Sequence, residues 1–422
     1  MRLPPIAAIR AATAAACIWL ATVQVATQAP PPPSADELFA GTTLQQIWLH
    51  INSRDWQQLR ARFKENTFYP CDLEWGGVIV RNAGCRSRGT GSRSGTKPGL
   101  FVEFDRYVTG QTFLGLQSLV LDNMWQDPSM IRERVSMRLF ERMGLPAPRE
   151  SHARLYVGSG REYAGLYAVV EDINEAFLQR TFGESGGYLY EYRWKDEYHL
   201  GDLGSDLASY ALRFEPRTHE TDSMFTLFAP IMDMIHAISD AAPETLETDL
   251  SPHLDVRRFL AHLATENFLA EWDGLLGYAG VNNFYLYRPA VTAPTQVIAW
   301  DRDYTFAFLQ MPPGHNVEGN VLAAKAWAEP GLRRFYLQQV LLAAATAAPW
   351  LEAEVGAVYA QIREAALEDP VKPVSNGEFE QAVSDLRSFV AARPAIVRRF
   401  VTEIAPDLNG TSRYPSREAR PR

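Results

Sequence analysis

The pattern of apolar residues changes near residue 172, and this change limits the possible folds more than any other feature of the chain. Before it, apolar and polar residues alternate in short runs, which is typical of β-strands. Such runs lie at 46–51, 100–104, 116–121, 153–157 and 163–170. One prominent helix interrupts them at 130–143, where Asp127, Pro128 and Ser129 form an N-terminal helix signal.

Helical spacing dominates the second half of the chain. The predicted helices cover 173–182, 224–238, 254–272, 319–345, 351–367 and 379–404. Two strand-like runs, 283–287 and 296–300, lie between them. We therefore expect an α+β fold with a β-rich lobe at 44–172, a helical lobe at 173–405 and a functional cleft between the two.

Composition supports a globular chain that does not bind nucleic acid. Hydrophobic residues make up 46% and charged residues 22% of the 422 residues, so the chain can bury a sizeable core. Its formal net charge is −9, which disfavours general attraction to the phosphates of nucleic acid.

The N-terminus has the parts of a secretory signal. Arg2 and Arg10 precede an apolar run at 11–23, and small residues and a proline string at 30–33 follow. At about 1.5 Å per residue the run reaches about 20 Å, short of the ~30 Å hydrocarbon core. We predict a signal peptide at 1–29, a proline-rich leader at 30–43, export without a stable membrane span, and a polar tail at 406–422. An uncleaved signal anchor is the alternative.

Two cysteines remain after the signal. Cys71 and Cys85 flank two β-type runs that meet at Gly76 and Gly77, a pattern that predicts a hairpin. The cysteines are then expected to face each other near its open end. In an oxidising compartment we predict a Cys71–Cys85 disulfide, with two buried free thiols as the alternative.

A basic, glycine-rich segment at 86–97 follows the hairpin. It fails as a P-loop, because Thr96 separates glycine from Lys97, Pro98 stands where a Ser or Thr should bind magnesium, and a strand follows. Lys97 and Arg88 are still candidates to hold nucleotide phosphates, since lysine and arginine both bind them. A solvated basic loop is the alternative.

The strongest constellation lies at 271–303. Asp273 follows a predicted helix, Asn282 and Asn283 begin one strand, and Asp301 and Asp303 end the next. One carboxylate can orient a hydroxyl and accept its proton, while another, with an amide, binds Mg²⁺. Ordinary turn aspartates are the alternative. No His-Glu-x-x-His zinc motif or Gly-x-Ser-x-Gly nucleophile motif occurs.

Together these residues resemble the CotH family of spore-coat-type secreted protein kinases, over about residues 44–310. The motifs that carry the resemblance are RGTGS at 88–92 with Lys97, DPS at 127–129 with Arg132 and Glu133, GLYAVVE at 165–171, GYLY at 187–190, Asp273-Gly274, NFYLY at 283–287, and WDRD at 300–303. The resemblance implies an atypical protein-kinase-like two-lobe fold with extra C-terminal helices.

The resemblance also implies a role for each residue. Asp273 resembles the catalytic aspartate and Asp301 the Mg²⁺-binding aspartate, with Asn283 and Asp303 as further metal candidates and Asn282 as a substitute for Asn283. Lys97 resembles the nucleotide-phosphate lysine, supported by Arg88. Glu133 is the candidate acid that pairs with Lys97, or else a solvent-facing helix charge. Glu171 either lines the adenine or ribose pocket or is structural.

The sequence supports three functional readings. The first is an exported kinase that uses ATP with Mg²⁺ or Mn²⁺ to phosphorylate Ser/Thr-type hydroxyls of a secreted, periplasmic or cell-surface protein. The second is a catalytically weak, kinase-like coat or adhesion scaffold. A third, an acidic hydrolase using Asp273, is poorer, because nothing fixes a second catalytic carboxylate within the ~5–10 Å that such chemistry needs.

Overall fold

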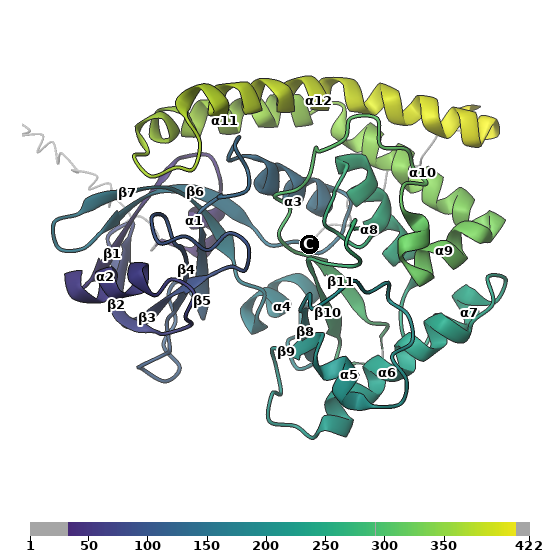
Figure 1. Cartoon of the computed structure of the whole chain (residues 1–422), viewed down its shortest axis with the longest axis horizontal. Coiled ribbons are helices and arrows are strands. Elements are labelled where there is room, and N and C mark those ends of the chain that lie inside the picture. The colour runs from purple at the N-terminus through teal and green to yellow at the C-terminus, as the bar shows by residue number, and fades with distance from the viewer. Residues whose placement is uncertain (1–32, 292, 411–422) are drawn as a thin grey trace, which may run out of the picture. The chain divides into compact units, whose positions relative to one another are not determined.

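The computed structural model describes residues 33–291 and 293–410. The predicted signal peptide at 1–29, the start of the leader and the tail beyond residue 410 lie outside these described residues. From Ser34 onward the chain forms one compact unit. It contains a barrel, a second sheet and a set of helices (Figure 1). The predicted α+β fold class is confirmed.

The strands of the first half close into a barrel. They are β1 (Gln45–Ile51), β2 (Tyr69–Trp75), β3 (Val78–Arg88), β4 (Gly99–Glu103), β5 (Ser118–Asp122), β6 (Glu150–Val157) and β7 (Glu162–Glu171). Their order around the barrel is β1-β2-β3-β4-β5-β7-β6. All neighbours are antiparallel except β1 and β6, whose parallel pairing closes the barrel with Gln45 opposite Ala153. Buried and exposed residues alternate along β1, so Ile47 and Leu49 point into the barrel core.

Three helices belong to this half: α1 (Ala35–Phe39), α2 (Ser53–Ala61) and α3 (Arg132–Arg142). Part of the predicted proline-rich leader is therefore folded, because α1 buries Leu38 and Phe39. The predicted helix signal before α3 acts through Asp127, whose carboxylate accepts hydrogen bonds from the backbone N–H groups of Ser129, Ile131 and Arg132.

The second half builds a small sheet and most of the helices. The sheet has the order β11-β10-β8-β9, with β8 (Tyr188–Tyr192), β9 (Phe214–Pro216), β10 (Phe284–Arg288) and β11 (Gln296–Ala299). The helices are α4 (Glu175–Phe182), α5 (Leu207–Ala211), α6 (Met224–Asp240), α7 (Leu246–Leu250), α8 (Val256–Leu269), α9 (Val321–Ala328), α10 (Pro330–Ala347), α11 (Leu351–Glu368) and α12 (Asn376–Ile404), with short 3₁₀ turns at Val317–Gly319 and Pro406–Gly410. The single helix predicted at 319–345 is two helices, because Pro330 begins α10.

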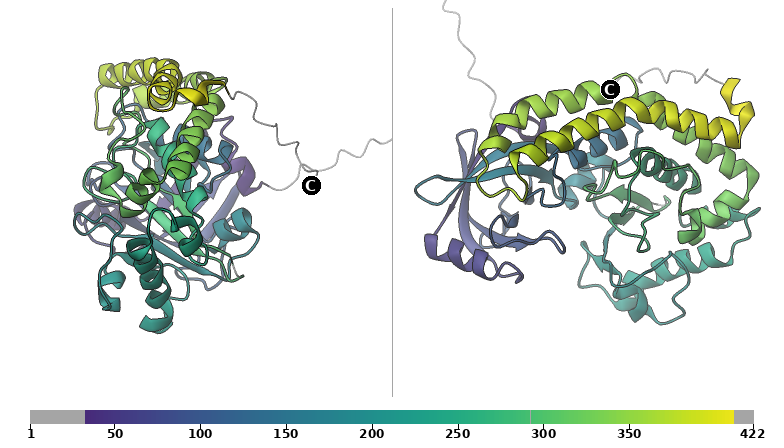
Figure 2. Two further views of the ribbon diagram at one scale, coloured as in Figure 1. Left: turned by 90° about the vertical axis from the view of Figure 1, so that its right-hand side faces the viewer. Right: turned by 45° about the horizontal axis from the view of Figure 1, so that its top comes forward.

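The last two helices bring the C-terminal part of the chain back to the barrel. Figures 1 and 2 show α11 and α12 side by side, and α11 packs against β7 and α3. Among the described residues no single helix has the length and apolar composition of a membrane span. Helices α10 and α11 reach this length and apolar composition only when the two are taken together, and the pair is bent by 51° at the break between them.

The hairpin is present, but the predicted disulfide is not. Strands β2 and β3 pair through a turn at Gly76 and Gly77, whose φ values of 58° and 79° are easily adopted by glycine. Cys71 lies opposite Ala83, and Cys85 lies opposite Tyr69, so the two cysteines are not directly across the ladder. Both are buried free thiols, the alternative stated above, and hydrogen bonding to Cys85 followed by burial raises the pKa of Cys71.

Candidate functional site

Asp273 is held in place by two asparagine side chains. It lies in the loop after α8, which ends in a left-handed cap at Ala270. The amides of Asn282 and Asn283 donate hydrogen bonds of 3.0 and 3.1 Å to its Oδ2 atom, and Asn283 also donates to the Asp273 carbonyl at 3.0 Å. Its backbone N–H donates to Oε1 of Glu271 at 2.7 Å. The carboxylate is therefore oriented before any ligand binds. Burial raises its pKa, although the two amides oppose that change.

Asp301 and Asn283 leave the small sheet at the same end. Phe284 pairs with Ala299 in the β10–β11 ladder, so the residues just before β10 and just after β11 lie close together. Both Asn283 and Asp301 have left-handed backbones, with φ of 58° and 51°. Such conformations cost free energy and are frequent at functional sites.

The carboxylate of Asp301 has no hydrogen bond or ion pair in the described part of the chain. Burial, followed by the negative charges of Asp122 and Asp273, raises its pKa to about 6, and Arg88 opposes these effects. A partly buried carboxylate in this condition is a suitable ligand for a cation.

Arg302, between the two aspartates, anchors this loop. Its guanidinium is fully buried and donates a 2.6 Å hydrogen bond to Oε1 of Glu266 on α8. The other oxygen of Glu266 accepts from the Leu275 N–H at 3.0 Å, two residues after Asp273. Glu266 therefore connects the loop of Asp273 to the loop of Asp301. Sequence reasoning missed this pair, because Glu266 belongs to no recognisable motif and Arg302, although it is part of the WDRD motif, was assigned no role.

Glu133 and Asp303 add negative charge to the same region. Burial raises the pKa of Glu133 well above its usual range; Glu150, Asp301 and Asp122 raise it further, and Arg88 lowers it. Burial likewise raises the pKa of Asp303, followed by repulsion from Glu133 and Asp301. Glu133 on α3 therefore lies near Arg88, Asp301 and Asp303.

Arg88 is the cation at the centre of this acidic cluster. It is the last residue of β3, and its Nη1 atom lies 3.0 Å from Oδ2 of Asp122. Burial alone would lower its pKa, but Asp122, Asp301 and Glu133 raise it. The two predicted phosphate cations are therefore separated, and only Arg88 lies among the candidate catalytic carboxylates.

The structure places Lys97 elsewhere. Its ammonium is 0% exposed and donates a 2.8 Å hydrogen bond to Oδ2 of Asp369, immediately after α11. The Leu166 N–H donates to the same oxygen at 3.0 Å, and a Cβ on Gly165 would lie 2.8 Å from the carboxylate. The prediction that Lys97 pairs with Glu133 is wrong, because Asp369 takes its charge in a closed interior site.

Glu171 has a structural environment as well. It is 1% exposed, and its oxygens accept hydrogen bonds from the guanidinium groups of Arg149 and Arg180, each with a contact of 2.7 Å. The Arg149 N–H adds a bond of 3.1 Å. These partners occupy both carboxylate oxygens, so the pocket-lining role expected for Glu171 is replaced by the structural alternative.

The fit of a metal ion can be judged from these positions. Within the described ranges, no three His, Cys, Asp or Glu side chains stand close enough to share one metal ion. Mg²⁺ needs only one or two carboxylates when phosphate oxygens and water complete its shell. Asp301, with the oxygen of the Asn283 amide, fits that smaller requirement.

Comparison with known proteins identifies the family. A family model described as CotH kinase protein matches residues 85–397, and the chain belongs to this family. The inner spore coat protein H of Bacillus subtilis (strain 168) is 26% identical over 303 residues, which cover 67% of this chain and 78% of that protein.

Solved structures show a more remote likeness. A chain of the HipA–HipB toxin–antitoxin complex with operator DNA from Shewanella oneidensis MR-1 has a TM-score of 0.34 at 12% identity, over 85% of this chain and 74% of that chain. The proinflammatory kinase CtkA of Helicobacter pylori has a TM-score of 0.29 at 10% identity, over 74% and 95%. Membership of the family rests on the sequence match.

Proposed function

We propose that the protein is an exported kinase that transfers the γ-phosphoryl group of ATP to Ser/Thr-type hydroxyls of a secreted or surface protein. The arrangement of Asp273 carries the proposal, since two amides orient its carboxylate beside the unpaired Asp301. Membership of the CotH kinase family supports it. The spore coat relative and the N-terminal signal pattern support a substrate outside the cytoplasm.

The roles follow from charge and position. Asp273 accepts the proton of the acceptor hydroxyl as that oxygen bonds to the γ-phosphorus and the bond to the β-phosphate oxygen breaks, releasing ADP. Arg88 binds the phosphates, and its ion pair with Asp122 holds its guanidinium in place. Asp301 and the oxygen of Asn283 are the first candidates to hold Mg²⁺ or Mn²⁺, with Asp303 as a further one. The metal would neutralise phosphate charge.

A catalytically weak scaffold is the second candidate. The burial of Lys97 favours it, because the lysine expected at the nucleotide phosphates pairs with Asp369 instead. Purified protein incubated with γ-labelled ATP, Mn²⁺ or Mg²⁺ and a Ser/Thr-rich acceptor protein distinguishes the two. Labelled phosphate on the acceptor supports the kinase; ATP binding without any incorporation supports the scaffold.

Asp301→Ala is expected to remove the metal-dependent part of nucleotide binding. The wild-type melting temperature should rise with ATP and Mg²⁺ together and much less with ATP plus a chelator. In the variant the two conditions should give the same value, because the metal has lost its main carboxylate. Asp233→Ala, at an exposed position on α6, is the matched control and should behave as wild type. An undiminished Mg²⁺ response in Asp301→Ala would remove the assignment.

The metal response should also depend on pH. Because the pKa of Asp301 is raised to about 6, its carboxylate is charged only above that pH. Without metal, protonation favours the folded state, so this group's contribution to stability is lost as the pH rises through about 6. Mg²⁺ needs the charged form, so the Mg²⁺-dependent rise in melting temperature should grow over the same interval. A Mg²⁺ response that is constant from pH 5 to pH 8, measured by titration at constant ionic strength, would contradict this.

A further inference from the structure

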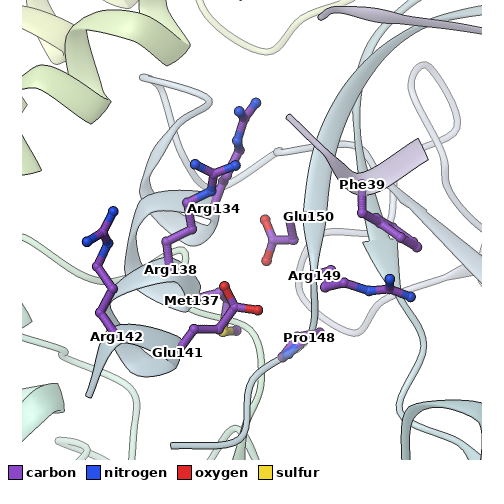
Figure 3. A pocket seen from close by; sticks show the side chains of 9 residues that line it. All are labelled: Phe39, Arg134, Met137, Arg138, Glu141, Arg142, Pro148, Arg149 and Glu150. Carbon is purple, nitrogen blue, oxygen red and sulfur yellow. The ribbon is translucent and has the colours of Figure 1, made fainter. Parts of the chain in front are cut away.

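A cavity of about 250 Å³ lies between α3 and β6, with Phe39 of α1 at its edge. Its charged lining residues are Arg134, Arg138, Glu141, Arg142, Arg149 and Glu150 (Figure 3). None of the residues given a catalytic, nucleotide or metal role above lines it. In Figure 3 the carboxylate of Glu150 points from β6 toward α3, where Arg134 and Arg138 project.

Several polar atoms of this lining are buried without a hydrogen-bond partner. They are both carboxylate oxygens of Glu150 and the Nε atoms of Arg134 and Arg149. Glu150 is 5% exposed and Arg134 is 2% exposed. Buried polar groups are nearly always paired, and leaving one unpaired destabilises the folded state. A ligand in the cavity would pair them.

The charges of the lining indicate the sign of that ligand. Glu354 neutralises Arg138 at 2.6 Å, and Asp36 and Glu171 neutralise Arg149. Arg134 donates only to uncharged partners, namely His152, Gln361 and the Gly41 carbonyl.

Arg142 has no carboxylate partner in the described part of the chain, and its guanidinium lies 4.2 Å from the ring centroid of Trp350. Arg134 and Arg142 at one cavity therefore make no ion pair with a carboxylate among the described residues, although Arg142 is exposed to solvent. This is notable in a protein with a net charge of −9.

We propose that this cavity binds a small oxyanion, phosphate being the simplest, through the N–H groups of Arg134, Arg142 and Arg149 and the carboxyl group of Glu150. The volume is below the ~300 Å³ lower end for drug-sized ligands, so a nucleotide is too large. Guanidinium groups are well suited to phosphate oxygens.

Glu150 is compatible with an anion when it is protonated, because its O–H then donates. Burial raises its pKa well above the usual range; Asp303, Asp122 and Glu141 raise it further, and Arg134 opposes them. The site is independent of phosphoryl transfer. A bound anion would connect β6 to α3, the helix that carries Glu133, and would stabilise both.

Inorganic phosphate tests the site. The measurements are titration calorimetry and melting temperature in phosphate against chloride at constant ionic strength, with Arg88→Gln as the background so that the candidate nucleotide site is weakened. Phosphate should raise the melting temperature and bind with defined stoichiometry. Arg142→Gln should weaken binding at least about tenfold. Arg257→Gln on α8 is the control of equal charge change and should have no effect.

Glu150→Gln should keep phosphate binding, because glutamine still supplies an N–H donor in place of the protonated carboxyl. Glycerol phosphate then distinguishes a phosphate ester from the free ion as the preferred form. Three results overturn the proposal. They are no phosphate effect in the Arg88→Gln background, the same effect after Arg142→Gln is added to that background, and loss of phosphate binding when Glu150→Gln alone is added. None of them bears on the kinase proposal, since Asp273→Asn should bind phosphate as the parent does.

Discussion

Asp273→Asn is expected to reduce phosphoryl transfer by about 10²–10⁴-fold, the typical contribution of a positioned general base. Asparagine has nearly the same shape, so the loop should fold as before. Its amide cannot accept the hydroxyl proton at neutral pH. The nucleotide contacts assigned to Arg88 and Asp301 are not removed, so the affinity for ATP with Mg²⁺ should stay within a few-fold of wild type.

Three measurements on the same preparations separate the possible outcomes: ATP affinity, melting temperature and labelled phosphate transferred. Asp233→Asn, an equal change of charge on the exposed side of α6, is the control. Near-normal transfer by Asp273→Asn would show that this aspartate is only a turn residue. Transfer absent from wild type and variant alike, with ATP still bound, would favour the scaffold.

Lys97→Met is expected to destabilise the fold by about 3–5 kcal/mol, the usual cost of removing one partner from a buried ion pair. Asp369 would remain charged in an interior site without its 2.8 Å ion-pair partner. Asp369→Asn should cost a comparable amount, although the two residues are 272 positions apart, because it leaves Lys97 unpaired. Urea unfolding with a shared slope gives both values.

Combining Lys97→Met with Asp369→Asn should recover most of the lost stability, since neither unpaired charge remains. The asparagine oxygen can still accept from the Leu166 or Val371 N–H, as Asp369 does. Lys64→Met, at an exposed position, is the control and should be nearly neutral. ATP affinity should be unchanged in the folded double variant. A Lys97→Met protein with normal stability but no ATP binding would return Lys97 to the nucleotide site.

The predictions for Lys97 and Asp369 concern a contact that the sequence alone could not reveal. The segment at 86–97 predicted a cation near phosphate, and the alternating run at 100–104 predicted the strand that is β4. The pattern could not show that Asp369 comes from the far end of the chain to neutralise Lys97, because pairing between distant residues leaves no local periodicity. The same applies to Glu171, whose role depends on Arg149 and Arg180.

Local signals worked better. Asp127 marked the start of α3, and the two glycines marked the hairpin between β2 and β3. Asp273, Asn283 and Asp301 lie together because they flank adjacent elements, which turn residues and short apolar runs reveal. Glu266 and Arg302 gave no such signal, because Glu266 on α8 and Arg302 in the loop after β11 each look like an ordinary surface charge in the sequence.

The closed barrel has a consequence for how the protein avoids aggregation. The parallel pairing of β1 with β6 leaves no unpaired strand in that sheet, so no backbone ladder is open to another molecule. The edges of the small sheet are short: β9 has three residues and ends in Pro216, and β11 has four. A proline and a short length both hinder the addition of a further strand. At high local concentration, chains of this protein should therefore resist pairing between the strand edges of neighbouring molecules.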